Sequence, residues 1–234
     1  MKNFTKIFFA VLIVSLFFFV GCSKKDSNVL TVGATPEPHA AMLKLVEDNL
    51  AEEGITLKVI DFTDYVTPNE ALEGGQLDAN FFQHLPYMDS FNAERGYHLV
   101  NAGGIHIEPV ALYSKKISSV DEIKDGATIA IPNDPTNEGR ALLLLQSAGL
   151  IKLDENAGIT ATPQNIVENP KNIKFHEIEA ASLPRVLLDV DAAVINGNYA
   201  IPAGLSANTD GLVVEGADSP YVNIIAVKEG NETS

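Results

Sequence analysis

Short apolar runs alternate with amphipathic stretches along the chain from residue 29 onward, and this alternation predicts strands and helices in turn. Apolar runs bounded by turn residues are expected as strands at 29–33, 56–62, 77–82, 98–102, 128–131, 172–177 and 192–195. Stretches with apolar residues at helical spacing are expected as helices at 38–53, 68–72, 84–96, 137–148 and 182–189, with a helical turn at 121–124. This order of elements is typical of βαβ units and therefore predicts parallel sheets in an α/β fold.

Two series of these units are separated by extended stretches at 109–115 and 221–228, which we expect to cross between two halves of the molecule. The predicted architecture is a clamshell of two lobes, each a mostly parallel sheet flanked by helices. We expect the first lobe to contain residues 29–110 with 222–234, and the second to contain 111–221. Open α/β sheets bind ligands beyond the carboxyl ends of their strands, so the site is expected in the cleft between the lobes.

The first 21 residues differ from the rest of the chain. Lys2 and Lys6 precede an apolar segment at 7–20 that is too short to span a bilayer comfortably and is typical of a signal peptide. The segment ends in Gly21-Cys22, which resembles the lipidation site of bacterial lipoproteins. We therefore expect 1–21 to be removed, Cys22 to carry the lipid and 22–28 to form a lipidated tether. With its single cysteine used in this way, the chain has no disulfide framework and no thiol for catalysis.

The charge balance restricts the class of ligand. The formal net charge is −15, and it becomes two units more negative without the signal segment, which holds two lysines and no acids. Nucleic-acid binding proteins need basic surface to replace the counterions of phosphates, so this class is excluded. A phosphate-binding loop of the GxxxxGK[ST] type follows none of the expected strands, which argues against a nucleotide.

The segment 128–149 has the strongest features of a binding element. A short apolar strand leads into a helix with Asp134 as a good N-cap and Pro135 at the first helical position. Free backbone N–H groups, the helix dipole and Arg140 are together expected to bind a carboxylate or phosphate. A small carboxylate ligand is the better interpretation, and an ordinary turn with a surface arginine is the structural alternative.

Aromatic and polar residues gather just after the predicted strand ends. The first lobe contributes mainly aromatic residues, namely Tyr65, Phe81, Phe82, His84, Pro86 and Tyr87. The second contributes polar residues, with an asparagine on the returning crossing: Asn133, Asp134, Arg140, Asn196, Asn198, Tyr199 and Asn223. Either Phe81 or Phe82 should belong to the core, because neighbours on a strand face opposite ways. The combination predicts a site for an amino acid with an apolar side chain, although single members could be turn or helix-start residues.

Several long motifs then occur in order: FTDYVTPNEAL, LDANFFQHLPY, PNDPTNEGRALLLLQ, IVENPKNI, VINGNYA and SPYVNIIAVK. Across nearly all of 29–228 they resemble the methionine-binding lipoproteins of bacterial ABC importers, which have a type II periplasmic-binding-protein-like fold. The resemblance implies that the thioether side chain lies among Tyr65, Phe82, His84 and Tyr87. It also implies that Arg140 pairs with the ligand carboxylate, while Asn196 and Asn223 hold its backbone groups. No catalytic residue, cofactor or metal is implied.

The resemblance also implies a partner and a location. A membrane permease and its ATPase would receive the ligand from the closed protein, and the lipid on Cys22 would hold the chain at the outer or periplasmic face of the cell membrane. These proteins usually continue with helices that pack on the first lobe, so an end at Ser234 suggests a truncated sequence.

Three alternatives are weighed against this function. The nearest is a different ligand in the same fold, either a methionine-containing dipeptide or another apolar amino acid. A metal-binding lipoprotein would use the five histidines, but no pair has the close spacing that helps gather ligands: His39, His84, His98, His106 and His176. An enzyme is disfavoured because the sequence has no nucleophile elbow and no recognised catalytic serine or cysteine motif.

Overall fold

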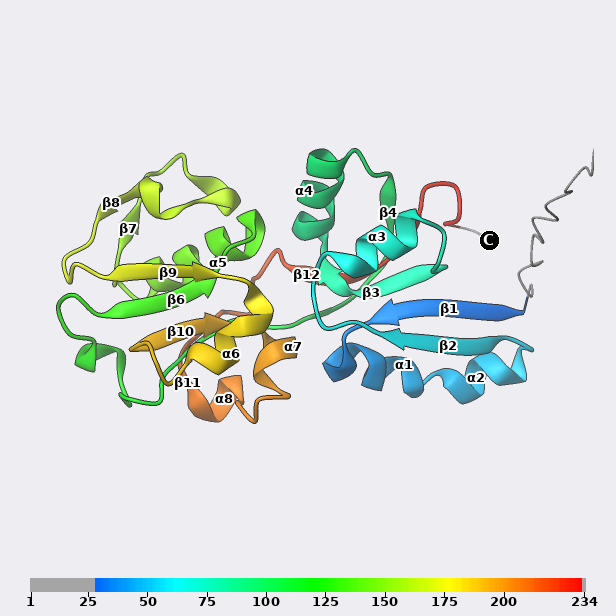
Figure 1. Cartoon of the computed structure of the whole chain (residues 1–234), viewed down its shortest axis with the longest axis horizontal. Helices are drawn as coiled ribbons and strands as arrows, with labels where there is room; N and C mark the ends of the chain where they lie inside the picture. The colour runs from blue at the N-terminus through cyan, green and yellow to red at the C-terminus, as the bar shows by residue number, and fades with distance from the viewer. Residues whose placement is uncertain (1–27, 233–234) are drawn as a thin grey trace, which may run out of the picture.

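The computed structural model describes residues 28–232, which form two α/β lobes side by side (Figure 1). The signal segment and Cys22 lie outside the described residues. Each lobe is built on a five-stranded sheet, and a separate two-stranded sheet accompanies the second lobe. No helix among the described residues is long and apolar enough to cross a membrane.

The sheet of the first lobe has the strand order β2-β1-β3-β12-β4. Its strands are β1 (Val29–Ala34), β2 (Thr56–Asp61), β3 (Ala79–His84), β4 (Leu99–Ile107) and β12 (Val222–Lys228). The first three strands pair in parallel, as the βαβ pattern predicts, whereas β12 returns from the second lobe and lies antiparallel between β3 and β4. The returning strand therefore makes the sheet mixed, and its pairing extends β4 five residues beyond the predicted end at 102.

The sheet of the second lobe has the order β11-β5-β10-β6-β9. Its strands are β5 (Ala111–Tyr113), β6 (Thr128–Pro132), β9 (Lys174–Ile178), β10 (Ala192–Ile195) and β11 (Gly211–Val214). Strands β6, β9 and β10 are parallel, and β5 and β11 add an antiparallel edge. Strands β7 (Lys152–Leu153) and β8 (Ile166–Glu168) form the small separate hairpin-like pair.

Helices and short helical turns connect these strands. In the first lobe they are η1 (Pro36–Ala40), α1 (Ala41–Lys44), α2 (Glu47–Glu52), α3 (Thr67–Glu73) and α4 (Leu85–Arg95). In the second lobe the helices are α5 (Pro135–Ser147), α6 (Leu183–Val186), α7 (Gly197–Ala200) and α8 (Ala207–Asp210). The 3₁₀ turns of that lobe are η2 (Val120–Glu122), η3 (Gly158–Thr160), η4 (Pro163–Asn165) and η5 (Ala180–Ser182).

The prediction of one continuous helix at 38–53 was wrong. The segment is divided into η1, α1 and α2, with Glu37 in extended backbone and a break at Leu45 and Val46. Glu37 directly precedes Pro38, and the ring of a proline disfavours helical backbone at the residue before it. Leu45, at the break, is 80% exposed.

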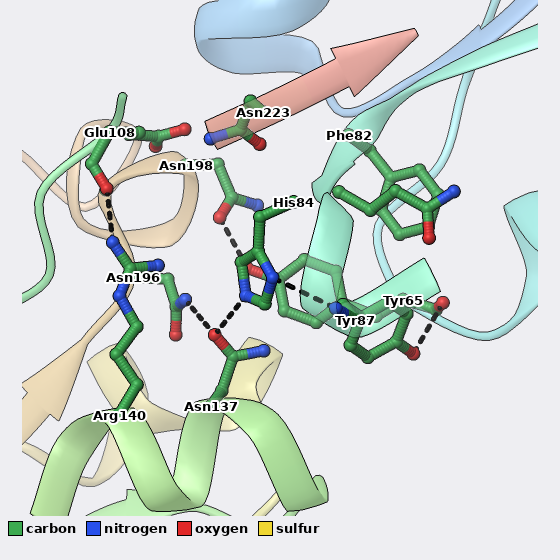
Figure 2. A pocket seen from close by; sticks show the side chains of 12 residues that line it. Tyr65, Phe82, His84, Tyr87, Glu108, Asn137, Arg140, Asn196, Asn198 and Asn223 are labelled. Atoms are coloured by element: carbon green, nitrogen blue, oxygen red, sulfur yellow. Dashed lines mark hydrogen bonds between the residues drawn. The ribbon is translucent and has the colours of Figure 1, made fainter. Parts of the chain in front are cut away.

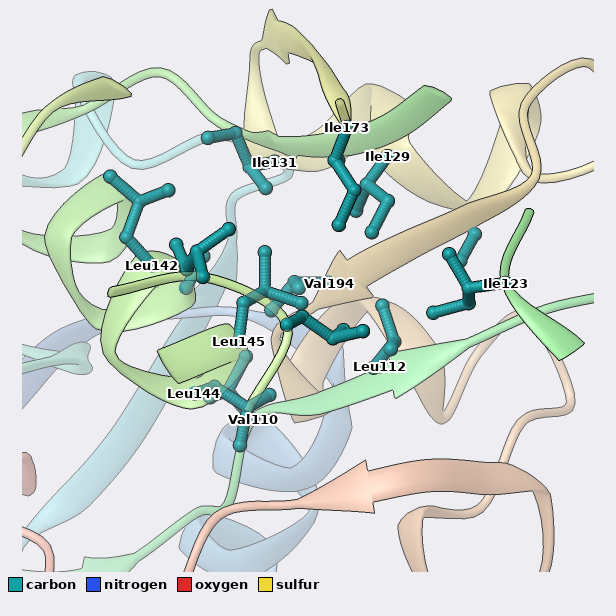
Figure 3. Packing of buried hydrophobic residues seen from close by; sticks show 14 of the residues in the cluster. Val110, Leu112, Ile123, Ile129, Ile131, Leu142, Leu144, Leu145, Ile173 and Val194 are labelled. Carbon is teal, nitrogen blue, oxygen red and sulfur yellow. The ribbon is translucent and has the colours of Figure 1, made fainter. Parts of the chain in front are cut away.

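Helix α5 is the centre of the second lobe's core (Figure 3). Leu142 and Leu145 are fully buried and pack with Ile129 and Ile131 of β6 and with Val194 of β10. Burial of a leucine side chain contributes about 1.5–3 kcal/mol, so these contacts fix the helix on the sheet. The start of α5 is consequently held at the edge where β6 ends.

Candidate functional site

A cavity lies between the two lobes, and residues of both lobes line it (Figure 2). The empty space in it, including the part that is open to solvent, is about 330 Å³. The lining consists of Tyr65, Phe82, Gln83, His84, Tyr87, Glu108, Asn137, Arg140, Asn196, Gly197, Asn198 and Asn223. All seven residues predicted to bind the ligand are in this set. Of the other residues noted at strand ends, Phe81 is buried in the core of the first lobe, and Asp134 caps α5.

The first lobe supplies an aromatic wall, formed by Tyr65, Phe82 and Tyr87. The ring centroids of each pair lie 5.8–6.1 Å apart, within the usual range for aromatic contacts. The hydroxyl of Tyr87 donates to the carbonyl of Tyr65 at 2.8 Å, which uses its polar group inside the wall. The rings are therefore held in place before any ligand enters.

His84 connects the aromatic wall to the second lobe. It caps α4, and its Nδ1 accepts the backbone N–H of Tyr87 at 3.1 Å. The proton of the neutral ring must then be on Nε2, which donates to Asn137 Oδ1 at 3.2 Å. Burial, with Arg140 nearby, lowers the pKa of His84 to about 3, so the ring is neutral at physiological pH. His84 acts here as a hydrogen-bonded, uncharged part of the wall.

The start of α5 has the predicted cap but not the predicted free donors. Asp134 is the N-cap and Pro135 follows it, as the sequence indicates. The Asp134 carboxylate, however, accepts both the backbone N–H of Asn137 at 3.0 Å and its side-chain amide at 2.9 Å. The expectation that these backbone groups would face a ligand was wrong for Asn137, because the capping carboxylate takes the N–H.

Arg140 reaches the cavity from α5 and is only 3% exposed. Its Nε and Nη2 donate to the carboxylate of Glu215, and Nη2 also donates to the carbonyl of Glu108 at 2.8 Å. The guanidinium carbon lies 4.4 Å from the ring centre of Tyr221. Nη1 has no hydrogen-bond partner within residues 28–232, so this end of the guanidinium remains available to an anion.

Glu215 was missed by sequence reasoning. It lies 75 positions from Arg140 and just beyond β11, where no motif marks it. An arginine buried this deeply needs a countercharge, so burial of Arg140 would have indicated that an acid was present without indicating which one.

Opposite the aromatic wall lies a polar wall made of one cation, one acid and three amides. Its residues are Arg140, Glu108, Asn137, Asn196 and Asn198. Asn196 donates to Asn137 Oδ1 at 2.8 Å, and Asn198 accepts the Tyr65 hydroxyl at 2.5 Å. The other end of each of these two amides is buried without a partner among the described residues, as is one oxygen of Glu108: Asn196 Oδ1, Asn198 Nδ2 and Glu108 Oε1. Buried polar atoms are normally paired, so unpaired ones around a cavity point to a ligand.

The register of β12 places Asn223, together with its neighbour His39, next to the cavity. Asn223 of β12 is opposite His84 on β3 and opposite His106 on β4. His39 Nε2 lies 3.3 Å from Asn223 Oδ1, and His39 Nδ1 lies 2.7 Å from the hydroxyl of Thr35. Burial lowers the pKa of His39 to about 4, so this ring is neutral as well. With its oxygen engaged by His39, Asn223 has its N–H₂ group left for the cavity.

His39, His106 and Glu108 have potential metal-ligand atoms within 4.8 Å of one another. Glu108 Oε2 is 3.7 Å from Nε2 of each histidine. His106 and Glu108 are two positions apart at the end of β4, but His39 lies on η1, so the sequence gave no sign that the three would meet. A divalent ion would need the Nε2 lone pair of His39, but that nitrogen already faces the Asn223 oxygen.

The chain has relatives among known protein families and solved structures. The model of the NlpA lipoprotein family matches residues 30–234. The D-methionine-binding lipoprotein MetQ of Escherichia coli K12 is 47% identical over 218 residues, which cover 91% of this chain and 80% of that protein. The membrane lipoprotein TpN32 of Treponema pallidum is 46% identical over 213 residues, with the same two coverages.

Solved structures give the same result for the fold. A nutrient-binding protein from Burkholderia cenocepacia, determined bound to methionine, superposes with a TM-score of 0.84 at 49% identity and covers 88% of this chain and 87% of its own. A lipoprotein from Ruminococcus gnavus superposes with a TM-score of 0.87 at 50% identity, with coverages of 89% and 87%. The two-lobed α/β clamshell predicted from the sequence is thereby confirmed. With the match of the family model over 30–234, these findings show that the chain belongs to the NlpA lipoprotein family.

Proposed function

We propose that this protein is the substrate-binding lipoprotein of an ABC importer and that it captures methionine in the cavity between its lobes. Relatives at 47–48% identity are named D-methionine-binding lipoproteins, and the structural relative from Burkholderia cenocepacia is bound to methionine. The proposed lobes are 29–110 with 222–234 and 111–221. The lipid on Cys22 would hold the protein at the membrane, where the permease and its ATPase receive the ligand.

The observation that carries the proposal is a set of unpaired donors and acceptors around one buried cavity. Arg140 Nη1 and the N–H₂ groups of Asn198 and Asn223 are donors suited to the ligand carboxylate. Asn196 Oδ1 is an acceptor suited to its ammonium group. The contact of the Asn223 oxygen with His39 Nε2 favours a donor role for Asn223.

The aromatic wall suits the side chain of methionine. A thioether sulfur gains about 0.3–1.5 kcal/mol from contact with an aromatic ring, and Tyr65, Phe82 and Tyr87 supply three rings with His84 beside them.

Hydrogen bonds between the lobes support a closed binding state. Tyr65 donates to Asn198, His84 donates to Asn137, and the hydroxyl of Tyr199 donates to the carbonyl of Thr63 at 3.2 Å. A ligand that contacts both walls stabilises this closed arrangement relative to an open one, and the permease would recognise it.

Two measurements test the proposal. Mass spectrometry of the small molecules that co-purify with the protein is expected to identify methionine. Calorimetry on ligand-free protein, with L-methionine, D-methionine, alanine and a methionine-containing dipeptide, is expected to give tightest binding for a methionine enantiomer. Tighter binding of the dipeptide or of a different apolar amino acid would show that this compound, and not methionine, is the ligand. The absence of binding to all four would refute the proposal.

A further inference from the structure

Glu108 has a buried carboxylate oxygen that its surroundings leave unpaired. The side chain is 11% exposed, and Oε1 has no hydrogen-bond partner within residues 28–232. Burying an ionised oxygen without a partner is costly, so it needs compensation from a cation or from several donors. The two neighbouring histidines do not provide it, because both lie 3.7 Å away and on the side of Oε2.

The unpaired oxygen lies between the two lobes. A Cβ atom placed on Gly197, the first residue of α7, would be 2.4 Å from Glu108 Oε1. With a glycine at that position, the second lobe approaches the carboxylate without displacing it. Gly197 of the second lobe therefore lies against this oxygen, and Glu108 is one of the residues that line the cavity.

Glu108 is also next to the residue proposed to bind the ligand carboxylate. Its backbone carbonyl accepts from Arg140 Nη2 at 2.8 Å, and Figure 2 shows its carboxylate above the guanidinium, beside Asn223. In an α-amino acid the carboxylate and the ammonium are attached to one carbon. An anion held by Arg140 Nη1 thus has its own ammonium within a short distance of Glu108.

We propose that Glu108 Oε1 accepts the ammonium group of the ligand and makes the site selective for a free α-amine. This assignment rests on the proposed function and identifies the countercharge that Asn196, a neutral amide, does not supply. Arg140 pairs with Glu215, so its positive charge is partly neutralised before a ligand binds. The contact between Glu108 and the ammonium group therefore provides a large share of the preference for a zwitterion over a simple carboxylate. N-acylated amino acids lack this cation and are expected to bind weakly.

The test measures two ligands against two proteins by calorimetry. The ligands are methionine and 4-(methylthio)butanoic acid, which keeps the carboxylate and the thioether but has no amine. The proteins are the wild type and Glu108→Gln, which keeps the shape of the side chain and removes its charge. Truncating one partner of a buried charge pair costs 2–5 kcal/mol, so methionine affinity is expected to fall about 30-fold or more. The affinity for the deaminated ligand is expected to change less than about threefold, because it makes no such pair.

Two further variants serve as controls. Glu108→Asp keeps the carboxylate and is expected to retain the preference for the amine, which a purely structural role for the side chain would not produce. Glu94→Gln changes a carboxylate that is 63% exposed and outside the cavity lining, and it is expected to leave both affinities unchanged.

Other outcomes of these measurements would contradict the proposed role of Glu108. Equal losses of affinity for both ligands, or no loss of methionine affinity, would overturn the role of Glu108. The proposed function would still hold in that case, provided that the wild type binds methionine. Methionine binding that is abolished by a chelator and restored by Zn²⁺ would also overturn it, because Glu108 would then belong to a metal site with His39 and His106. Failure of the wild type to bind methionine would refute the proposed function itself.

Discussion

The two walls of the cavity differ in how completely their polar groups are paired. In the aromatic wall, the hydroxyls of Tyr65 and Tyr87 donate to Asn198 and to the carbonyl of Tyr65. In the polar wall, Asn196, Asn198 and Glu108 each keep one buried atom without a partner among the described residues. The aromatic wall is thus complete without a ligand, whereas the polar wall is completed by one.

Because of this difference, we expect the polar wall to set the affinity for amino acids in general and the aromatic wall to set the selectivity among them. An unpaired buried polar atom costs about 1–3 kcal/mol until it is paired, so the polar wall gains most from any zwitterion. An apolar pocket distinguishes ligands by only about 1–3 kcal/mol for each methylene, so the aromatic wall decides which zwitterion binds best. Mutations in the two walls should therefore have different signatures across a set of amino acids.

The largest effect is expected for Arg140→Ala. This change removes the only cation proposed to bind the ligand carboxylate, and methionine affinity should fall about 100- to 1,000-fold, in line with the loss of one partner of a buried charge pair. Alanine and methionine should lose similar factors, because both carry the carboxylate. Isothermal calorimetry with both amino acids measures this, and unchanged affinity would refute the role of Arg140.

The control for Arg140→Ala is the double variant Arg140→Ala/Glu215→Gln. The single change leaves the Glu215 carboxylate without its cation, which lowers the free energy of unfolding and could lower affinity indirectly. The double change removes that unpaired charge, so a thermal melt should show recovered stability. If affinity recovered together with stability, the direct contact with the ligand would be disproved.

A smaller and more selective effect is expected for Phe82→Ala. Removing this buried ring deletes one face of the aromatic wall, and methionine affinity should fall about tenfold from lost sulfur–aromatic contact and lost burial. Alanine does not reach the wall, so its affinity should change little. Competition calorimetry of the two ligands gives the ratio, and equal losses would show that Phe82 is needed for folding of the site rather than for selectivity.

Much of this site was predictable because strand ends and residue types are local properties of the sequence. Tyr65, Phe82 and Arg140 each follow or end an element whose apolar pattern is clear, so their meeting in one cleft followed from α/β topology. Glu108 and Glu215 were missed because their importance depends on contacts with residues distant in the sequence: Gly197 lies against Glu108, and Glu215 pairs with Arg140. The roles of His39 and His106 depend on the register of β12, which no local pattern contains.

The fold shows the same division between local and distant causes. Helix α5 was predicted with its cap because Asp134 and Pro135 fix its start and its leucines fix its buried face. The segment 38–53 has a similar apolar spacing but breaks at Leu45, where no tertiary contact buries the side chain. Periodicity alone therefore predicts a long helix only where capping and packing agree with it.

A modest effect is expected for Tyr65→Phe, because the hydroxyl of Tyr65 links the two walls. The substitution keeps the ring but removes the hydroxyl that donates to Asn198 across the cleft. Loss of one such bond costs about 0.5–1.5 kcal/mol, so affinities for methionine and alanine should both fall about threefold to tenfold. Small-angle scattering with saturating methionine should show a larger open fraction than in the wild type. A loss confined to methionine would instead assign the hydroxyl to side-chain recognition.

The smallest effect on binding is expected for Glu138→Gln, which changes α5 one residue away from the polar wall. Burial, with Glu177 and Asp134 nearby, raises the pKa of Glu138 from 4.5 to about 7. Between these values the folded state holds a proton that the unfolded state has released, so this group's contribution to stability is full below pH 4.5 and is lost as pH rises through 7. The neutral glutamine cannot titrate, so the stability difference between variant and wild type should increase in favour of the variant from pH 5 to 8.

Urea unfolding at several pH values measures that difference, and subtracting the variant cancels the opposite contributions of His39 and His84, whose pKa values are lowered. Methionine affinity at pH 7 should be the same in both proteins, because Glu138 is not part of the cavity lining. If affinity fell with the charge of Glu138, the polar wall would extend further along α5 than its unpaired atoms indicate. A pH-independent stability difference would show that Glu138 ionises normally in the folded protein.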